Sequence, residues 1–139
     1  MNKTIIQKVT EIFPGTRLKE PLSKHCTFRV GGPADAFLEL KDLSPETIQN
    51  LKDLLKLLKK TATPTLIIGG GSNILFRDKG FRGVVIKITA NNVIINKTTL
   101  TAEAGAILQA VIAKAKNKGF YNLSPLTGIP GTLGGAIRG

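Results

Sequence analysis

Residues 67–73 are Ile-Ile-Gly-Gly-Gly-Ser-Asn, the most informative segment of the sequence. The apolar run 65–68 predicts a short buried strand, and three consecutive glycines end it at once. Glycine lets backbone approach a ligand closely, and successive amide N–H groups in such a turn can form an anion-binding concavity. Ser72 and Asn73 add hydrogen-bonding side chains. The stretch predicts a strand that runs into an anion-binding loop, with a tight, capped glycine turn as the alternative.

Two common phosphate-binding motifs do not fit this loop. The dinucleotide fingerprint requires a glycine three positions after Gly71, where this chain has Ile74. A P-loop requires Gly-Lys-Ser or Gly-Lys-Thr, and the chain contains neither sequence. If the loop binds a nucleotide, it therefore does so in another fold.

Two further segments have a composition suited to ligand contact. Residues 128–136, Gly-Ile-Pro-Gly-Thr-Leu-Gly-Gly-Ala, combine a fixed proline φ with glycines and could present backbone amides, or could be a plain connector. Residues 27–32, Thr-Phe-Arg-Val-Gly-Gly, contain Arg29, which could pair with a phosphate or lie on the surface. Several glycine loops in one short chain suggest that they meet around one extended anion.

The first half of the chain predicts a parallel arrangement. Apolar spacing indicates a helix over residues 3–13 and a strand over 34–40. Ser44 and Pro45 are suited to begin a helix whose apolar face continues to Lys60. With the strand at 65–68, this order predicts a parallel strand pair joined by a helical crossover.

The pattern changes near residues 80–83. Three short β-rich runs predict an antiparallel meander, at residues 84–88, 93–96 and 99–103. A helix is expected over 106–118, with Ile107, Val111 and Ala115 facing inward and Gly119 closing it. The composition break predicts two small α+β lobes.

Composition narrows the class of function. The net charge is +11, from 20 Lys and Arg against 9 Asp and Glu, which suits anionic partners. Nucleic acid is not expected, because the basic residues are scattered and no RNA-recognition or zinc-finger signature is present. Cys26 and His25 are the only residues of their types, so an internal disulfide and multi-thiolate or multi-histidine metal sites are excluded. No apolar run approaches the roughly 18 residues of a membrane span, so no membrane partner and a cytoplasmic location are expected.

Four blocks, in order, carry a family resemblance. They are Thr-Phe-Arg-Val-Gly-Gly-Pro-Ala-Asp at 27–35, Gly-Gly-Gly-Ser-Asn-Ile-Leu-Phe at 69–76, Gly-Phe-Arg-Gly-Val-Val-Ile at 80–86, and the glycine-rich block at 128–136. Together they resemble the UDP-N-acetylenolpyruvoylglucosamine reductase (UDP-N-acetylmuramate dehydrogenase) family, from about residue 22 to 139. One departure is Cys26, where the family commonly has Asn, which changes the side-chain hydrogen bonding of that turn.

The resemblance implies an α+β, FAD-binding fold of the vanillyl-alcohol-oxidase (PCMH) type, with FAD held between two small α+β lobes. Residues 1–21 would be an N-terminal segment, and 22–139 a partial FAD-binding domain with lobes at about 22–83 and 84–139, the second incomplete. The residues implied to contact FAD are Gly69, Gly70, Gly71, Ser72, Asn73, Gly128, Ile129, Pro130, Gly131 and Thr132. Residues 27–32 would lie at the edge of the site, and His25 would be a loop residue without a chemical role.

The resemblance also implies a reaction of peptidoglycan synthesis. NADPH reduces FAD, which passes a hydride to the enolpyruvyl double bond of UDP-N-acetylglucosamine enolpyruvate to give UDP-N-acetylmuramate. The family's catalytic arginine, serine and glutamate would follow the position of Gly139, so no catalytic or metal-ligating residue is assigned and residues 1–139 alone are expected to be inactive. The alternatives are another FAD-dependent oxidoreductase of the same fold and a non-catalytic nucleotide-binding remnant. Oligomeric state is left open.

Overall fold

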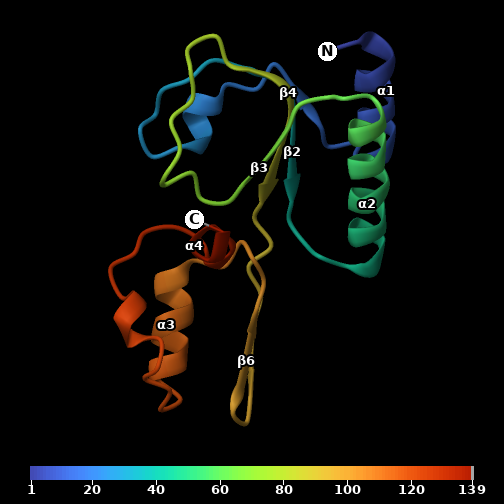
Figure 1. The fold of residues 1–139 in the computed structure, drawn as a ribbon. Coiled ribbons are helices and arrows are strands. Elements are labelled where there is room, and N and C mark those ends of the chain that lie inside the picture. Colours follow the sequence, from blue (N-terminus) through green and yellow to red (C-terminus); the bar gives the residue numbers. More distant parts are fainter. Residues whose placement is uncertain (139) are drawn as a thin grey trace.

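The computed structural model describes residues 1–138, which form two small layered parts (Figure 1). Gly139, the last residue of the predicted FAD-binding domain, lies outside the described residues. The first part contains a four-stranded sheet in the order β1-β2-β4-β3. Its strands are β1 (Arg17–Leu18), β2 (Ala34–Leu40), β3 (Thr65–Ile68) and β4 (Phe81–Ile88). Both β2 and β3 run parallel to β4, whereas β1 is antiparallel to β2.

Two helices cover one face of this sheet, α1 (Lys3–Ile12) and α2 (Pro45–Lys60) (Figure 1). The Ser44 side chain accepts a hydrogen bond from the Thr47 amide at 3.2 Å and caps α2, and Pro45 stands in its first turn. Beneath the helices lies a core of fully buried residues: Val9, Ala36, Leu38, Leu40, Leu54, Leu58, Val84 and Ile86. The predicted helices and the strands at 34–40 and 65–68 are confirmed.

The opposite face of the sheet is covered by loops and the 3₁₀ helix η1 (Leu22–His25) instead of long helices. A second apolar cluster fills this layer: Leu22, Cys26, Ala34, Phe37, Ile68, Phe76 and Val85. Alternate residues of β2 and β4 therefore enter different cores, as the two-residue period of a strand requires. This loop-covered layer contains the glycine segment that follows β3.

The second part begins after β4. A hairpin of β5 (Val93–Asn96) and β6 (Thr99–Ala102) is followed by α3 (Leu108–Lys116), the 3₁₀ helix η2 (Ser124–Leu126) and α4 (Leu133–Arg138). The hairpin, α3 and α4 lie together beyond the ends of β2 and β3 (Figure 1). No helix among residues 1–138 combines the length and apolar character needed to cross a bilayer.

The predicted antiparallel meander is wrong in its first strand. Residues 84–88 belong to β4, which pairs with both β2 and β3, so only the strands at 93–96 and 99–102 are antiparallel partners. Val84, Val85 and Ile86 are all fully buried, the pattern of a central parallel strand. Gly83 lets the Pro64 carbonyl approach, and the Val84 amide donates to it at 2.9 Å. The sheet of the first part therefore extends to Ile88, beyond the composition break at 80–83.

Two other sequence expectations need correction. The strands at 34–40 and 65–68 share a parallel sheet but are not neighbours, because β4 lies between them. Ile107 was expected to face inward, yet it is 61% exposed, because α3 begins one residue later and buries Leu108, Val111, Ile112 and Ala115. Gly119 has φ of +82° just after α3, as expected of a helix-ending glycine.

Candidate functional site

The two predicted glycine loops lie side by side in the structure. Ser72 Oγ donates a hydrogen bond to the Pro130 carbonyl oxygen at 3.3 Å, although the residues are 58 positions apart. A Cβ built on Gly70 would lie 3.7 Å from Thr132 Cγ2 and 3.8 Å from Gly131 Cα. The loop after β3 and the loop before α4 are therefore two walls of one location, at the carboxyl end of β3.

The first loop presents backbone donors that the protein does not use. Within residues 1–138, the amide N–H groups of Gly70, Gly71, Ser72 and Asn73 donate no hydrogen bond. Gly71 has φ of +73°, the left-handed conformation that turns successive amides toward one concave side. Gly70 and Asn73 are exposed, so the amides at the two ends of this set can reach a ligand. An anionic group such as a pyrophosphate fits this set of donors.

A short segment of the first part supports the loop from below. A Cβ on Gly71 would collide with the His25 carbonyl oxygen and would lie 2.9 Å from Cys26 Cα. On the other side, the Thr27 amide donates to the Gly71 carbonyl oxygen at 3.1 Å. The loop thus rests directly on residues 25–27, and only glycine fits at position 71.

The second loop is held by the start of α3. The Leu108 amide donates to the Gly131 carbonyl oxygen at 3.1 Å, and Gln109 Nε2 donates to the Ile129 carbonyl oxygen at 3.0 Å. Gln109 Nε2 also lies 3.3 Å from the Leu126 carbonyl oxygen. Sequence reasoning missed Gln109, since a lone glutamine on a helix face gives no local signal of a long-range contact. Gly128, Ile129 and Pro130 remain exposed beside the first loop.

Thr132 is the buried residue of the second loop, with 7% of its surface exposed, whereas Gly128, Ile129 and Pro130 are exposed. Its Oγ1 accepts a hydrogen bond from the Gly135 amide at 3.4 Å and occupies the place where a Cβ on Gly69 would stand. The side chain of Thr132 therefore interlocks with Gly69, and this contact sets the spacing of the two loops.

Replacing Gly69 with alanine tests this interlock. We expect a loss of about 1–3 kcal/mol in the free energy of unfolding, because the added methyl group overpacks the Thr132 hydroxyl. Combining Gly69→Ala with Thr132→Ala should cost less than the sum of the two single changes, by about 0.5 kcal/mol or more. Urea denaturation of the four proteins measures this, with Gly15→Ala, where no atom lies within 4 Å of the new Cβ, as the control. Strictly additive costs would contradict the interlock.

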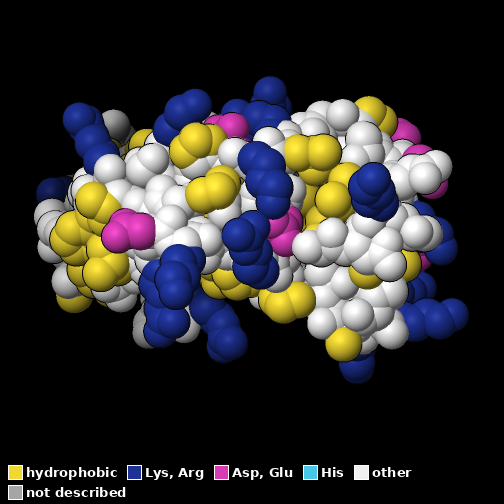
Figure 2. Space-filling view, turned by 90° about the horizontal axis from the view of Figure 1, so that it is seen from above, with side chains coloured by type: hydrophobic (Ala, Val, Ile, Leu, Met, Phe, Trp, Pro, Cys, Tyr) yellow, Lys and Arg dark blue, Asp and Glu magenta, His cyan; other side chains and the backbone are white. Residues whose placement is uncertain are grey.

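Residues 27–32, the segment predicted to lie at the edge of the site, are next to the first loop. The Gly32 amide donates to the Arg77 carbonyl oxygen at 3.0 Å, which joins residues 27–32 to the continuation of the glycine loop. Arg29 is exposed and has φ of +54°, which is uncommon for a residue other than glycine. Figure 2 shows Lys and Arg side chains scattered over the face seen from above, among apolar and a few acidic side chains. The net charge of +11 favours an anionic ligand.

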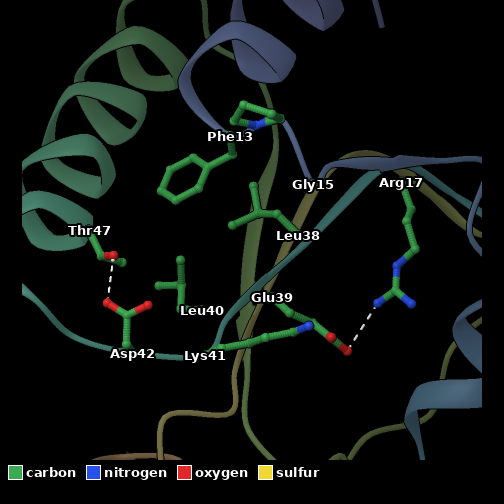
Figure 3. A pocket seen from close by; sticks show the side chains of 10 residues that line it. Phe13, Gly15, Arg17, Leu38, Glu39, Leu40, Lys41, Asp42 and Thr47 are labelled. Carbon is green, nitrogen blue, oxygen red and sulfur yellow. Dashed lines mark hydrogen bonds and ion pairs between the residues drawn. The ribbon is translucent and has the colours of Figure 1, made fainter.

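A separate pocket lies at the other edge of the sheet, between the end of α1 and the start of α2 (Figure 3). Phe13, Leu38 and Leu40 form its apolar side. Its carboxylates are already engaged: Glu39 Oε1 pairs with Arg17 at 3.0 Å, and Asp42 Oδ1 accepts from Thr47 Oγ1 at 2.8 Å. The pocket includes none of the predicted contact residues. Among residues 1–138, no group of three or more His, Cys, Asp or Glu side chains is placed to hold a metal ion.

Comparison with protein families gives one match, to the FAD binding domain family over residues 42–139. The matched region includes both glycine loops, the strand β4 and the start of α3. It begins just before α2, so α1, β1 and β2 lie outside it.

Curated relatives extend the likeness over most of the chain. A UDP-N-acetylenolpyruvoylglucosamine reductase from Clostridioides difficile is 48% identical over 126 residues, covering 87% of this chain and 39% of the relative. The reductase of that name from Agathobacter rectalis is 40% identical and covers 99% of this chain and 47% of its own length. The chain therefore spans less than half the length of these relatives.

Solved structures agree with the fold. The UDP-N-acetylenolpyruvylglucosamine reductase from Thermus caldophilus superposes with a TM-score of 0.63 at 27% identity, covering 88% of this chain and 41% of that structure. An alkyldihydroxyacetonephosphate synthase superposes with a TM-score of 0.55 at 16% identity, which shows the fold alone. The predicted α+β fold of the PCMH type is thereby confirmed.

Proposed function

The chain belongs to the FAD binding domain family, and from this membership we propose that it forms the FAD-binding part of a UDP-N-acetylenolpyruvoylglucosamine reductase. The reaction would be the NADPH-dependent reduction of UDP-N-acetylglucosamine enolpyruvate to UDP-N-acetylmuramate, a step of peptidoglycan synthesis. The two ligands besides FAD would be this UDP-sugar and NADPH. The proposed location is the cytoplasm, where both are available.

One observation of the structure carries the cofactor assignment. Two glycine loops far apart in sequence meet, and four consecutive amides of the first loop, from Gly70 to Asn73, are unused within residues 1–138. FAD has a pyrophosphate in its centre, and such a group accepts several backbone hydrogen bonds without needing a charged side chain. We assign the pyrophosphate to Gly69, Gly70, Gly71, Ser72 and Asn73.

The second loop would contact FAD from the opposite side. Gly128, Ile129 and Pro130 are exposed, and the amides of Gly131 and Thr132 donate no hydrogen bond within residues 1–138. Thr132 itself would act through the loop backbone, because its hydroxyl is turned toward Gly69 and Gly135.

When bound, FAD supplies the hydride chemistry, and the protein supplies orientation and electrostatics. The rigid sheet fixes the start of the first loop, and α3 fixes the second through Leu108 and Gln109. Because both loops are already anchored, they would lose little conformational entropy when they bind an extended cofactor. No residue among 1–138 is assigned a role in protonating the substrate.

A chimera tests the proposed function. Residues 1–139 are joined to the part of the Clostridioides difficile relative that follows its matched region, and NADPH oxidation is measured with the enolpyruvyl substrate. We expect the chimera to retain a flavin and to turn over, because the rest of the relative would supply the catalytic groups that the family resemblance implies. Residues 1–139 alone serve as the control and should give no turnover above a protein-free reaction. A folded chimera without flavin absorbance would contradict the proposal.

A further inference from the structure

His25 belongs to a buried polar cluster outside the loops. It ends η1 with 8% of its surface exposed, and its Nε2 lies 3.0 Å from Glu20 Oε1. Its ring stacks on Phe37, with centroids 4.1 Å apart and planes inclined by 23°. The Arg17 guanidinium lies 4.8 Å from the centroid of the Phe37 ring and 3.7 Å from Glu20 Oε1. The imidazole is therefore fixed by a hydrogen bond at its edge and by an aromatic ring against its face.

The direction of the hydrogen bond follows from the state of the carboxyl group. The hydrogen bond from His25 lowers the pKa of Glu20; burial opposes this shift, while the charges of Arg17 and Lys24 add to it. Glu20 is therefore ionised at neutral pH and can only accept, so His25 Nε2 donates. A hydrogen bond with one ionised partner is stronger than one between neutral groups.

The backbone of His25 connects this cluster to the first glycine loop. The carbonyl oxygen of His25 lies against Gly71 Cα, at the place where a side chain would stand. Two residues later, the Thr27 amide donates to the Gly71 carbonyl oxygen at 3.1 Å. Cys26, which lies between these two residues, is also constrained, because its Sγ lies 3.3 Å from the Val30 carbonyl oxygen. A shift of the imidazole would therefore move the surface on which Gly71 rests.

We propose that His25 and Glu20 are a positioning pair for the anion-binding loop, in which the anchored imidazole holds residues 25–27 under Gly71 and keeps the amides of Ser72 and Asn73 aimed at the cofactor. This inference rests on the proposed FAD function and deepens it, since it assigns a role to residues that do not touch the ligand. It adds a positioning role for His25, which the sequence predicts to be a loop residue without a chemical role.

The experiment compares two replacements of His25 in the 139-residue chain. His25→Gln keeps an N–H donor for Glu20, whereas His25→Leu keeps apolar bulk against Phe37 and removes the donor. Hydrogen exchange of the Thr27 amide reports the contact with Gly71 without any ligand. We expect His25→Leu to raise this exchange rate about tenfold and to weaken FAD binding about tenfold, as the loss of one charge-assisted hydrogen bond would. His25→Gln should change the Thr27 exchange rate and the affinity for FAD by no more than about threefold.

Lys24→Gln, which changes the exposed neighbour of His25, is the matched control and should leave Thr27 exchange unchanged. Amides of β2 and β4 must keep their wild-type protection in every variant, which separates loop positioning from general unfolding. Wild-type Thr27 exchange in His25→Leu would overturn the inference, and so would failure of His25→Gln to restore it. A folded wild-type chain that binds no FAD would instead count against the proposed function, and Thr27 exchange would still decide the positioning role.

Discussion

Replacing Gly70 with valine is expected to remove most of the bound FAD while the protein stays folded. Gly70 is exposed and has no positive φ, and the nearest atom to a Cβ there is Thr132 Cγ2 at 3.7 Å, an ordinary van der Waals distance. The backbone can therefore accept the change. A branched side chain would nevertheless fill the space between the two loops, where the pyrophosphate is proposed to lie, and close backbone approach would be lost.

Two other glycines make this result interpretable. Gly15→Val places the same side chain in an exposed turn with no atom within 4 Å, and flavin content should be unchanged. Gly71→Val forces a branched residue into a positive φ and against the His25 carbonyl, so both fold and flavin should be lost. Flavin per protein is read from absorbance of the chimera, and folding from circular dichroism. Normal flavin content in Gly70→Val would remove the pyrophosphate assignment from this loop.

The candidate loops could be predicted from sequence because their signal is local. Three glycines directly after an apolar strand, followed by Ser72 and Asn73, indicate backbone that can bind a ligand, and the amides from Gly70 to Asn73 donate no hydrogen bond within residues 1–138. The contacts that hold the loops could not be predicted. Glu20–His25 and Gln109–Ile129 join residues that become neighbours only after the sheet and α3 are packed. Nothing in the local sequence distinguishes such residues from an ordinary surface glutamine or a loop histidine.

The fold shows the same division between local and distant information. Elements with strong periodicity and a capping residue, such as α2 after Ser44, form where the sequence predicts them. The position of β4 in the sheet could not be predicted, because Gly80 just before it and Gly83 within it resemble a boundary between two lobes. In the structure these glycines instead allow close backbone packing. A Cβ on Gly80 would collide with the Pro33 carbonyl oxygen, and one on Gly83 with that of Pro64. In a single sequence, a glycine that permits close packing cannot be distinguished from a glycine that ends a helix or strand.

Asp35 is expected to be the ionisable side chain on which folding depends most. It lies in β2 with 2% of its surface exposed. Its Oδ1 accepts hydrogen bonds from Lys19 Nζ at 2.7 Å and Arg82 Nη1 at 3.1 Å, and its Oδ2 accepts from the Met1 amine at 2.8 Å. Lys19 directly follows β1, and Arg82 lies in β4. Because β1 and β4 are the two neighbours of β2 in the sheet, the Asp35 carboxylate links both of them to β2.

The pH dependence of this contribution has a definite sign. Burial raises the pKa of Asp35, but the hydrogen bonds from Lys19, the Met1 amine and Arg82 together outweigh it and hold the pKa well below its usual value. A carboxyl whose pKa is lower in the folded than in the unfolded state stabilises the fold above the unfolded pKa, about 4 for aspartate. The contribution is then lost progressively as the pH falls below that value.

Asp35→Asn should therefore lower the free energy of unfolding by about 3 kcal/mol at pH 7, the cost of breaking a buried ion pair while its partners remain. Urea denaturation at a series of pH values measures the difference in the free energy of unfolding between wild type and variant. The difference should narrow below about pH 4, because the Asp35 carboxyl of the unfolded chain then takes up a proton, while the folded carboxyl with its lower pKa is still ionised. The matched control is Asp53→Asn, which removes a half-exposed carboxylate whose Oδ1 lies 3.5 Å from Lys56 Nζ on the surface of α2. It should change stability far less than Asp35→Asn does, because an exposed ion pair contributes little. A gap at pH 7 no larger than that of the control, or one that persists unchanged at pH 3, would show that Asp35 does not hold β1 and β4 to β2 by its charge.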